Sequence, residues 1–139
     1  MGRMPNLILA ASGLGALLAL TAAQLPSALA QAQPGLWEIS GVPGANGPIR
    51  QCIGSVAMLA RFEHRSKSCS AKILKDAGNM ALIDYSCGGA GFGHSEIELL
   101  TPRSLRISTQ GISGGLPFNY VLQARRVDDC QKNVAVMRH

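Results

Sequence analysis

Four widely separated cysteines constrain this 139-residue chain more than any other feature of its sequence. They are Cys52, Cys69, Cys87 and Cys130, and all follow an apolar N-terminal segment typical of exported proteins. In an exported chain an even number of cysteines indicates disulfide bonds, and four cysteines allow three pairings. The chain contains no Cys-x-x-Cys, which is the spacing that zinc sites and redox dithiols use. The cysteines therefore predict two disulfides rather than a metal centre or a redox site.

The N-terminal segment has the pattern of a secretory signal peptide. Arg3 supplies its positive charge, an uncharged apolar run follows over residues 7–23, and Ala28-Leu29-Ala30 has the small-x-small pattern of a cleavage site. We predict a cleaved signal over residues 1–30, one domain over residues 31–130 and a flexible tail over residues 131–139. The alternative, an uncleaved membrane anchor, is disfavoured because the run is short and no basic cluster follows it. The predicted location is periplasmic or secreted, with no transmembrane anchor after cleavage.

The sequence between the second and third cysteines selects among the disulfide pairings. Two apolar runs flank residues 76–79, Asp-Ala-Gly-Asn, which is typical of a β-hairpin. Centring the hairpin on Gly78 pairs Cys69 with Cys87, Lys72 with Asp84, Ile73 with Ile83 and Leu74 with Leu82. Cysteines directly opposed on two strands can meet disulfide geometry. We therefore predict a Cys69–Cys87 bond and, by elimination, a Cys52–Cys130 bond.

The rest of the chain alternates apolar and polar residues in short runs that glycine and proline separate. Besides the hairpin, strands are expected near residues 36–40, 49–53, 94–100, 105–110 and 118–127. A brief helix is expected over residues 55–62, with Ser55 as its cap, and a flexible or bulged connection over residues 88–93. This pattern predicts a mainly β fold, a curved antiparallel meander or open barrel of about seven strands with one short helix and two disulfides.

No motif in the sequence assigns a reaction. Residues 111–115 match Gly-x-Ser-x-Gly, but a strand is expected after them, whereas a nucleophile elbow requires a helix. His64 lies in the basic segment 61–67, which predicts a solvated loop, and local spacing gives His94 no acidic partner. We therefore predict no catalytic residue, no metal ligand and no cofactor.

Four residues are expected to lie in the core or to face a ligand, and they are Trp37, Ile83, Tyr85 and Phe118. A closed apolar cavity between them would favour binding of a small apolar ligand. A cleft that joins His94 to a carboxylate would instead favour catalysis. The net charge of +5 is small, and the scarcity of aromatic residues in an exported chain argues against nucleic-acid binding.

Several segments occur in the order seen in an exported bacterial family, the domain of unknown function 3617. They are Pro34-Gly35-Leu36-Trp37-Glu38-Ile39, Arg50-Gln51-Cys52, Ser68-Cys69-Ser70, Tyr85-Ser86-Cys87 and Val127-Asp128-Asp129-Cys130. The chain resembles this family over residues 34–130, and the resemblance implies a small periplasmic protein with no established activity. It implies no catalytic residues. The chain departs from the family at Gly54-Ser55-Val56, where an acidic helix start is usual.

Together these features predict an exported periplasmic protein that acts as a non-enzymatic binding or envelope-associated accessory domain. Its expected partner is a small apolar ligand, an envelope component or another protein. The alternative is a small periplasmic enzyme or enzyme inhibitor whose site residues come from loops.

Overall fold

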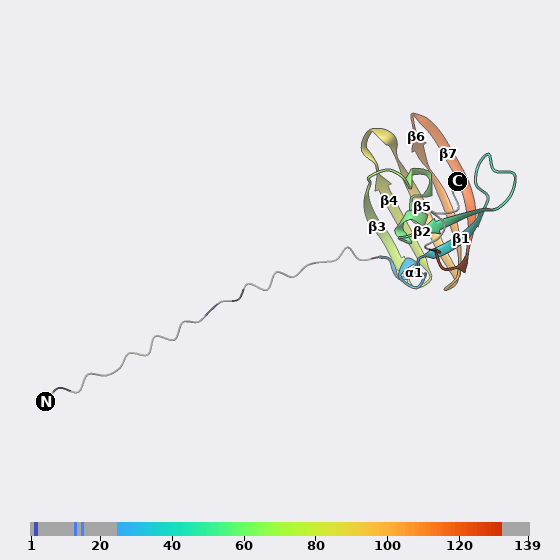
Figure 1. Ribbon diagram of the computed structural model, residues 1–139. Helices are drawn as coiled ribbons and strands as arrows, with labels where there is room; N and C mark the ends of the chain where they lie inside the picture. Colours follow the sequence, from blue (N-terminus) through green and yellow to red (C-terminus); the bar gives the residue numbers. More distant parts are fainter. Residues whose placement is uncertain (1, 3–12, 14, 16–24, 132–139) are drawn as a thin grey trace.

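Seven antiparallel strands form one open sheet in the order β2-β1-β7-β6-β5-β4-β3, with β2 and β3 at its edges. The computed structural model describes residues 2, 13, 15 and 25–131. The strands are β1 Gly35–Ser40, β2 Ile49–Ile53, β3 Ser70–Ala77, β4 Met80–Ser86, β5 Gly91–Thr101, β6 Ser104–Ser113 and β7 Leu116–Asp128. Figure 1 shows the strands side by side and the chain entering the fold at α1. The predicted mainly β fold with about seven strands and two disulfides is confirmed.

Two short α-helices are present where the sequence predicted one. They are α1 Ser27–Ala30 and α2 Ala57–Ala60, and two 3₁₀ turns accompany them, η1 Phe62–His64 and η2 Gly88–Ala90. The helix expected over residues 55–62 is divided between α2 and η1, and Ser55 does not cap it, because Val56 occupies the N-cap position without a side-chain hydrogen bond. Helices this short are not stable alone. They persist because they bury Leu29, Leu59 and Phe62 against the sheet.

The core lies between these helices and one face of the sheet. Successive residues of a strand point to opposite faces, so the apolar residues of every second position gather on one face. The buried apolar members of β1 and β4–β7, beside the buried polar Ser95 and Thr109, are Trp37, Ile39, Ala81, Ile83, Tyr85, Ile97, Leu99, Leu105, Ile107, Leu122 and Ala124. α1 contacts β3, β4 and β5, and α2 contacts β5 and β6. The opposite face of the sheet carries no helix in the described part of the chain and is largely polar.

The predicted hairpin forms with one correction to its register. Ile73 lies opposite Ile83, and Lys72 lies opposite Asp84, as expected. Leu82 lies opposite Lys75 rather than Leu74, because a β-bulge between Ile73 and Lys75 adds one residue to β3. The turn therefore comprises two residues between paired Ala77 and Met80, and Gly78 adopts a φ of 64° within it. Glycine is favoured at this position because positive φ is unfavourable for residues with a Cβ.

Both predicted disulfides are confirmed. Cys69 and Cys87 stand just outside the ends of β3 and β4, with their Cα atoms 4.1 Å apart. Cys52 in β2 bonds to Cys130, two residues beyond the end of β7, with a Cα–Cα distance of 5.6 Å. The Cys52–Cys130 bond therefore ties the edge strand β2 to the segment that follows β7.

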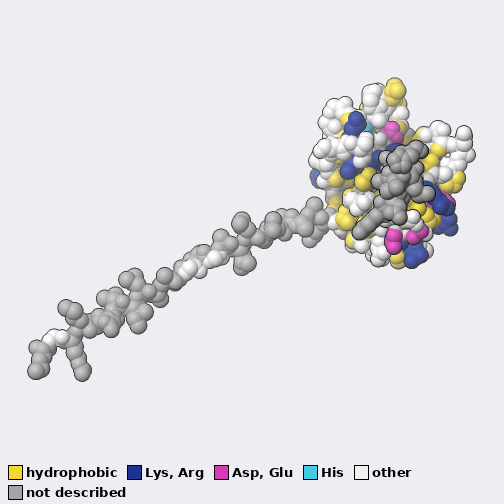
Figure 2. Space-filling view, in the orientation of Figure 1, with side chains coloured by type: hydrophobic (Ala, Val, Ile, Leu, Met, Phe, Trp, Pro, Cys, Tyr) yellow, Lys and Arg dark blue, Asp and Glu magenta, His cyan; other side chains and the backbone are white. Residues whose placement is uncertain are grey.

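The basic side chains are dispersed. On the face shown in Figure 2, Lys and Arg lie in several separate places with apolar and acidic side chains between them. The described residues contain no helix that has both the length and the apolarity to cross a membrane. The apolar run of the predicted signal peptide and nearly all of the predicted tail lie outside the described residues, so the structure does not test those predictions.

Candidate functional site

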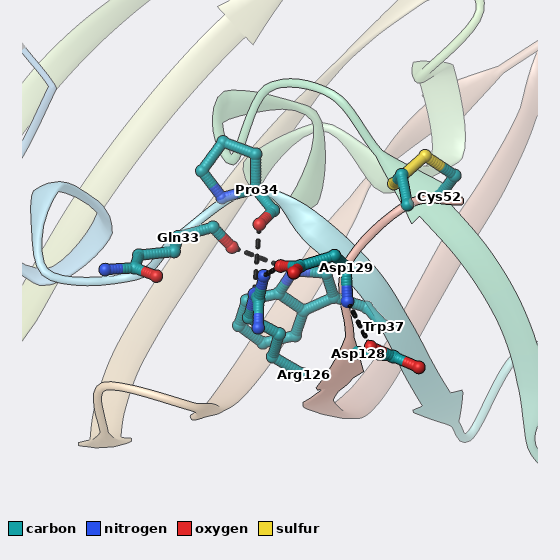
Figure 3. A network of polar contacts seen from close by, with 8 residues as sticks. Gln33, Pro34, Trp37, Cys52, Arg126, Asp128 and Asp129 are labelled. Carbon is teal, nitrogen blue, oxygen red and sulfur yellow. Dashed lines mark hydrogen bonds and ion pairs between the residues drawn. A yellow bond between two sulfur atoms is a disulfide. The ribbon is translucent and has the colours of Figure 1, made fainter. Parts of the chain in front are cut away.

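The four residues expected in the core or at a ligand do not surround one closed cavity. Trp37 is fully buried, and its indole Nε1 donates a hydrogen bond to the carbonyl oxygen of Gln33 at 3.1 Å (Figure 3). Ile83 and Tyr85 are also buried, and Phe118 is half-buried. Trp37 lines neither the hollow of about 740 Å³ nor the one of about 380 Å³. Trp37 and Ile83 belong to the core cluster, whereas Tyr85 and Phe118 also line the hollow of about 740 Å³.

A polar row crosses five strands on the opposite face of the sheet. The strand register sets its members directly opposite one another, in the order Lys72, Asp84, His94, Gln110 and Asn119. The row lines an open groove of about 740 Å³. Because each strand contributes one side chain at the same level, ammonium, carboxylate, imidazole and amide groups lie in a line across the strands.

An apolar row borders the polar one. It is formed by Phe92 and Ile112, which pair with each other across β5 and β6. The side chain of Phe92 is 54% exposed, a large value for an aromatic residue in the interior of a sheet. The groove therefore offers hydrogen-bonding groups beside an accessible aromatic ring, which is the composition of a site for an amphipathic ligand.

His94 has an acidic partner that local sequence spacing did not reveal. Its Nδ1 lies 2.5 Å from Oδ1 of Asp84, the residue directly opposite on β4. Both side chains are accessible to solvent from the groove. The pair fixes the orientation of the imidazole and leaves its Nε2 without a protein partner among the described contacts. The sequence predicted Lys72 opposite Asp84, but it placed a connection over residues 88–93, whereas β5 already begins at Gly91, so the register that sets His94 opposite Asp84 did not follow from it.

The prediction of a solvated loop around His64 is wrong. The His64 side chain is 2% exposed and packs edge-on against the rings of Tyr85 and Phe118. Its Nε2 lies 3.1 Å from the carbonyl oxygen of Ala90, which can only accept, and its Nδ1 lies 3.1 Å from the Tyr85 hydroxyl. A neutral imidazole therefore donates from Nε2 to Ala90 and accepts at Nδ1 from Tyr85. His64 is a core residue that ties η1 to β4 and η2.

The two tyrosines under the groove are held in their neutral form. Burial raises the pKa of Tyr85 to about 12. The pKa of Tyr120 is raised further, first by burial and then by its hydrogen bond to the Glu63 carboxylate, which accepts from the hydroxyl at 2.7 Å. In the described residues every buried side-chain nitrogen and oxygen atom has a hydrogen-bond partner. This buried cluster is satisfied internally and supports the sheet rather than a ligand.

The basic segment folds onto itself. Arg61 donates to the carbonyl oxygens of His64, Arg65 and Lys67 at 2.8–3.2 Å, and Arg65 stacks over the ring of Phe62 with its guanidinium 4.1 Å from the centroid. These arginines therefore stabilise the connection between η1 and β3. They are not presented together as a binding patch.

Neither a serine nucleophile nor a metal site is formed by the residues that the structure describes. The Gly-x-Ser-x-Gly segment spans the end of β6 and the tight turn into β7, with no helix after Ser113. That geometry is incompatible with a nucleophile elbow. Among the described residues no three His, Cys, Asp or Glu side chains gather where they could hold a metal ion.

Comparisons with protein-family models, with curated proteins and with solved structures found no match for this chain.

Proposed function

We propose that this protein is an exported binding domain whose groove on the uncovered face of the sheet takes a polysaccharide of the cell envelope. The observation that carries the proposal is the row of five polar side chains beside the exposed ring of Phe92. Sugar rings carry hydroxyl and amide groups on their edges and C–H groups on their faces. The polar row suits the edges, and Phe92 suits an apolar face.

An open groove favours a polymer over a small apolar ligand. An apolar ligand requires enclosure, because its affinity comes from surface removed from water. The groove is open, and its polar members include both donors and acceptors. Mixed charge at Lys72, Asp84 and His94 also favours a ligand with both amide and carboxylate groups, such as the peptide-bearing glycan of a bacterial wall.

The proposal is tested by titrating the purified protein with soluble peptidoglycan fragments in a calorimeter. We expect Phe92→Ala to weaken binding by about tenfold or more, since it removes the apolar wall of the groove. Leu100→Ala is the matched control, because Leu100 is 50% exposed on the same strand but lies outside the groove. Equal affinity of the Phe92→Ala variant and the parent protein, or no binding of any fragment, would contradict the proposal.

A second function is favoured by one contact. The His94–Asp84 pair has the orientation that a histidine needs to act as a general base, with the carboxylate fixing the ring. In this case the domain would hydrolyse the bound polymer. Mass spectrometry of peptidoglycan fragments after incubation distinguishes the two functions. Cleavage by the parent but not by His94→Gln would establish an enzyme, and intact fragments would leave the binding function.

We further propose a periplasmic or secreted location and membership of the family of domain of unknown function 3617. The location is supported by two disulfides, which persist in oxidising compartments, and by the signal-like N-terminal sequence. The family is supported by the order of its segments around Trp37 and the four cysteines. Cell fractionation of the bacterium that produces the protein tests the location directly.

A further inference from the structure

The predicted cleavage site lies inside a segment that the fold buries. Residues Ala28 and Leu29 of α1 are 0% and 1% exposed and belong to the core cluster. Cleavage after Ala30 would remove both side chains from the molecule. The position that they occupy would then open to solvent. Residues 28 and 29 therefore show which kind of side chain fits the groove that cleavage would leave empty.

The groove lies between α2 and the strands at the β3 edge of the sheet. Beside α1 it already contains a hollow of about 380 Å³, so the segment does not fill it. Apart from residues 25–29, its walls are mainly apolar and come from Ala57, Ala60, Cys69, Ala71, Ile73, Ile83 and Tyr85. Arg61 also lines it, but its guanidinium donates to the backbone carbonyl oxygens of its own segment. Leu29 enters this wall, whereas Leu25 at the mouth remains 40% exposed. The groove thus accepts a short apolar segment with one deeply buried leucine.

Apolar burial rather than hydrogen bonding attaches α1 to the rest of the fold. In the described part of the chain, one hydrogen bond joins residues 25–32 to the rest of the fold, from the backbone nitrogen of Ser27 to Oδ1 of Asp76 at 3.0 Å. The anchored chain begins at Gln33, whose carbonyl oxygen accepts from Trp37. The carbonyl oxygen of Pro34 accepts from Arg126, which also pairs with Asp129 (Figure 3). The boundary between removable and anchored chain therefore falls just after the predicted cleavage site.

We propose that processing after Ala30 opens this groove, and that it binds a short uncharged apolar peptide segment of a partner protein in the way it holds Ala28 and Leu29. The inference rests on the proposed export and cleavage, and not on the polysaccharide groove. A leucine of the partner takes the place of Leu29. In the unprocessed chain α1 blocks the site, so binding becomes available only after export.

The test starts from the protein exported by a bacterium that expresses the full chain. Intact mass gives its first residue, which we expect to be Gln31. The probe is a blocked peptide of sequence Leu-Pro-Ser-Ala-Leu-Ala, residues 25–30, and binding is read from the melting temperature and by calorimetry. We expect the peptide to raise the melting temperature, and a peptide with Asp in place of Leu29 to bind at least about tenfold more weakly.

Two neighbouring exposed residues of β3 supply matched variants. Ile73 lines the groove and is 40% exposed, whereas Leu74 is 47% exposed and does not line it. Ile73→Asp should abolish peptide binding, and Leu74→Asp should preserve it. Phe92→Ala should leave peptide binding unchanged, which separates this site from the polysaccharide groove.

Four outcomes would overturn the proposal. The first is an exported protein whose first residue lies upstream of Leu25, which would make α1 a permanent part of the core. The second is a Gln31 form that does not fold, and the third is a folded Gln31 form that does not bind the peptide. The fourth is a groove that binds a fatty acid but not the peptide. A first residue upstream of Leu25, or a folded Gln31 form that does not bind the peptide, leaves binding of peptidoglycan fragments beside Phe92 untouched, so in these cases the two proposals fail separately.

Discussion

At the scale of single residues, burial decides which polar side chains are structural and which can act. His64 has charged neighbours in the sequence, Glu63 and Arg65, and is buried, whereas His94 lies between Gly93 and Ser95 and faces the groove. Tyr85 and Tyr120 donate to His64 and Glu63. Burial raises the pKa of both hydroxyls because the anion would lose its hydration, and for Tyr120 the hydrogen bond to Glu63 raises it further. Both tyrosines therefore contribute stability only while they stay protonated.

This protonation predicts a loss of stability at high pH. The ordinary tyrosine pKa is 10.0, and that of Tyr85 in the fold is about 12. A raised folded-state pKa contributes stability that is complete below pH 10 and is lost as pH rises toward 12. We expect the urea midpoint to fall over this interval. Ultraviolet titration of tyrosinate should show neither of the two tyrosines ionising near pH 10 while the protein is folded.

Tyr85→Phe supplies the control for that titration, because it leaves Tyr120 alone to ionise. A tyrosine with an ordinary pKa in the folded protein would contradict the buried arrangement. A urea midpoint that does not change between pH 9 and pH 11, about the ordinary pKa, would contradict it equally.

At the scale of elements, two glycines allow β4, β5 and β6 to approach one another closely beneath the groove. A Cβ at Gly93 would enter the ring of Tyr85, and a Cβ at Gly111 would clash with the carbonyl oxygen of Phe92 and lie 2.7 Å from Cα of Gly93. Neither glycine has a positive φ, so available space rather than backbone conformation requires glycine there. The sequence marked residues 88–93 as a connection, whereas β5 begins at Gly91 and continues through Gly93.

We therefore expect Gly111→Ala to destabilise the protein by about 2 kcal/mol or more, since β5 and β6 must separate to admit the methyl group. Gly54→Ala is the control, because nothing lies within 4 Å of its added Cβ and its φ is not positive. That control should change stability by less than about 0.5 kcal/mol. Chemical denaturation measures both variants, and equal stability of the two would show that the strands do not approach as described.

At the scale of the whole molecule, the two disulfides enclose nested lengths of chain. The Cys52–Cys130 bond joins residues 78 apart, and the Cys69–Cys87 bond joins residues 18 apart. In the chain-entropy account a longer closed loop restricts the unfolded chain more, which gives about 4.5 and about 3 kcal/mol respectively. Such values are a large share of the stability of a small domain. The sheet is open, so the longer bond also holds its β2 edge to the end of β7.

We expect the paired variant Cys52→Ser/Cys130→Ser to lose more stability than Cys69→Ser/Cys87→Ser. Denaturation of both variants under non-reducing conditions measures the difference in stability. The parent protein under reducing conditions gives the stability that remains when both disulfides are absent. A reduced parent that melts at the same temperature as the oxidised one would contradict the structural role of both bonds. A larger loss in the Cys69→Ser/Cys87→Ser variant would contradict the loop-length argument alone.

The sequence by itself determined the fold class, the hairpin around Gly78 and both disulfides. These follow from alternation, turn chemistry and cysteine spacing, which act over short distances along the chain. It did not determine the bulge at Leu74, because β3 is an edge strand with every residue exposed, and burial therefore does not specify its register. Nor could it place Phe92, Gln110 and Asn119 in one groove with His94 and Asp84.

Only the tertiary structure decided which residues share a site, because the groove is made by the register of five strands rather than by neighbours in the chain. The same is true of His64, whose basic neighbours indicated solvent while the packing of η1 against β4 buried it. It is also true of α1, which reads as the end of a signal peptide and yet places Leu29 in the core. Local chemistry sets what each segment can become, and burial between distant segments decides what each side chain does.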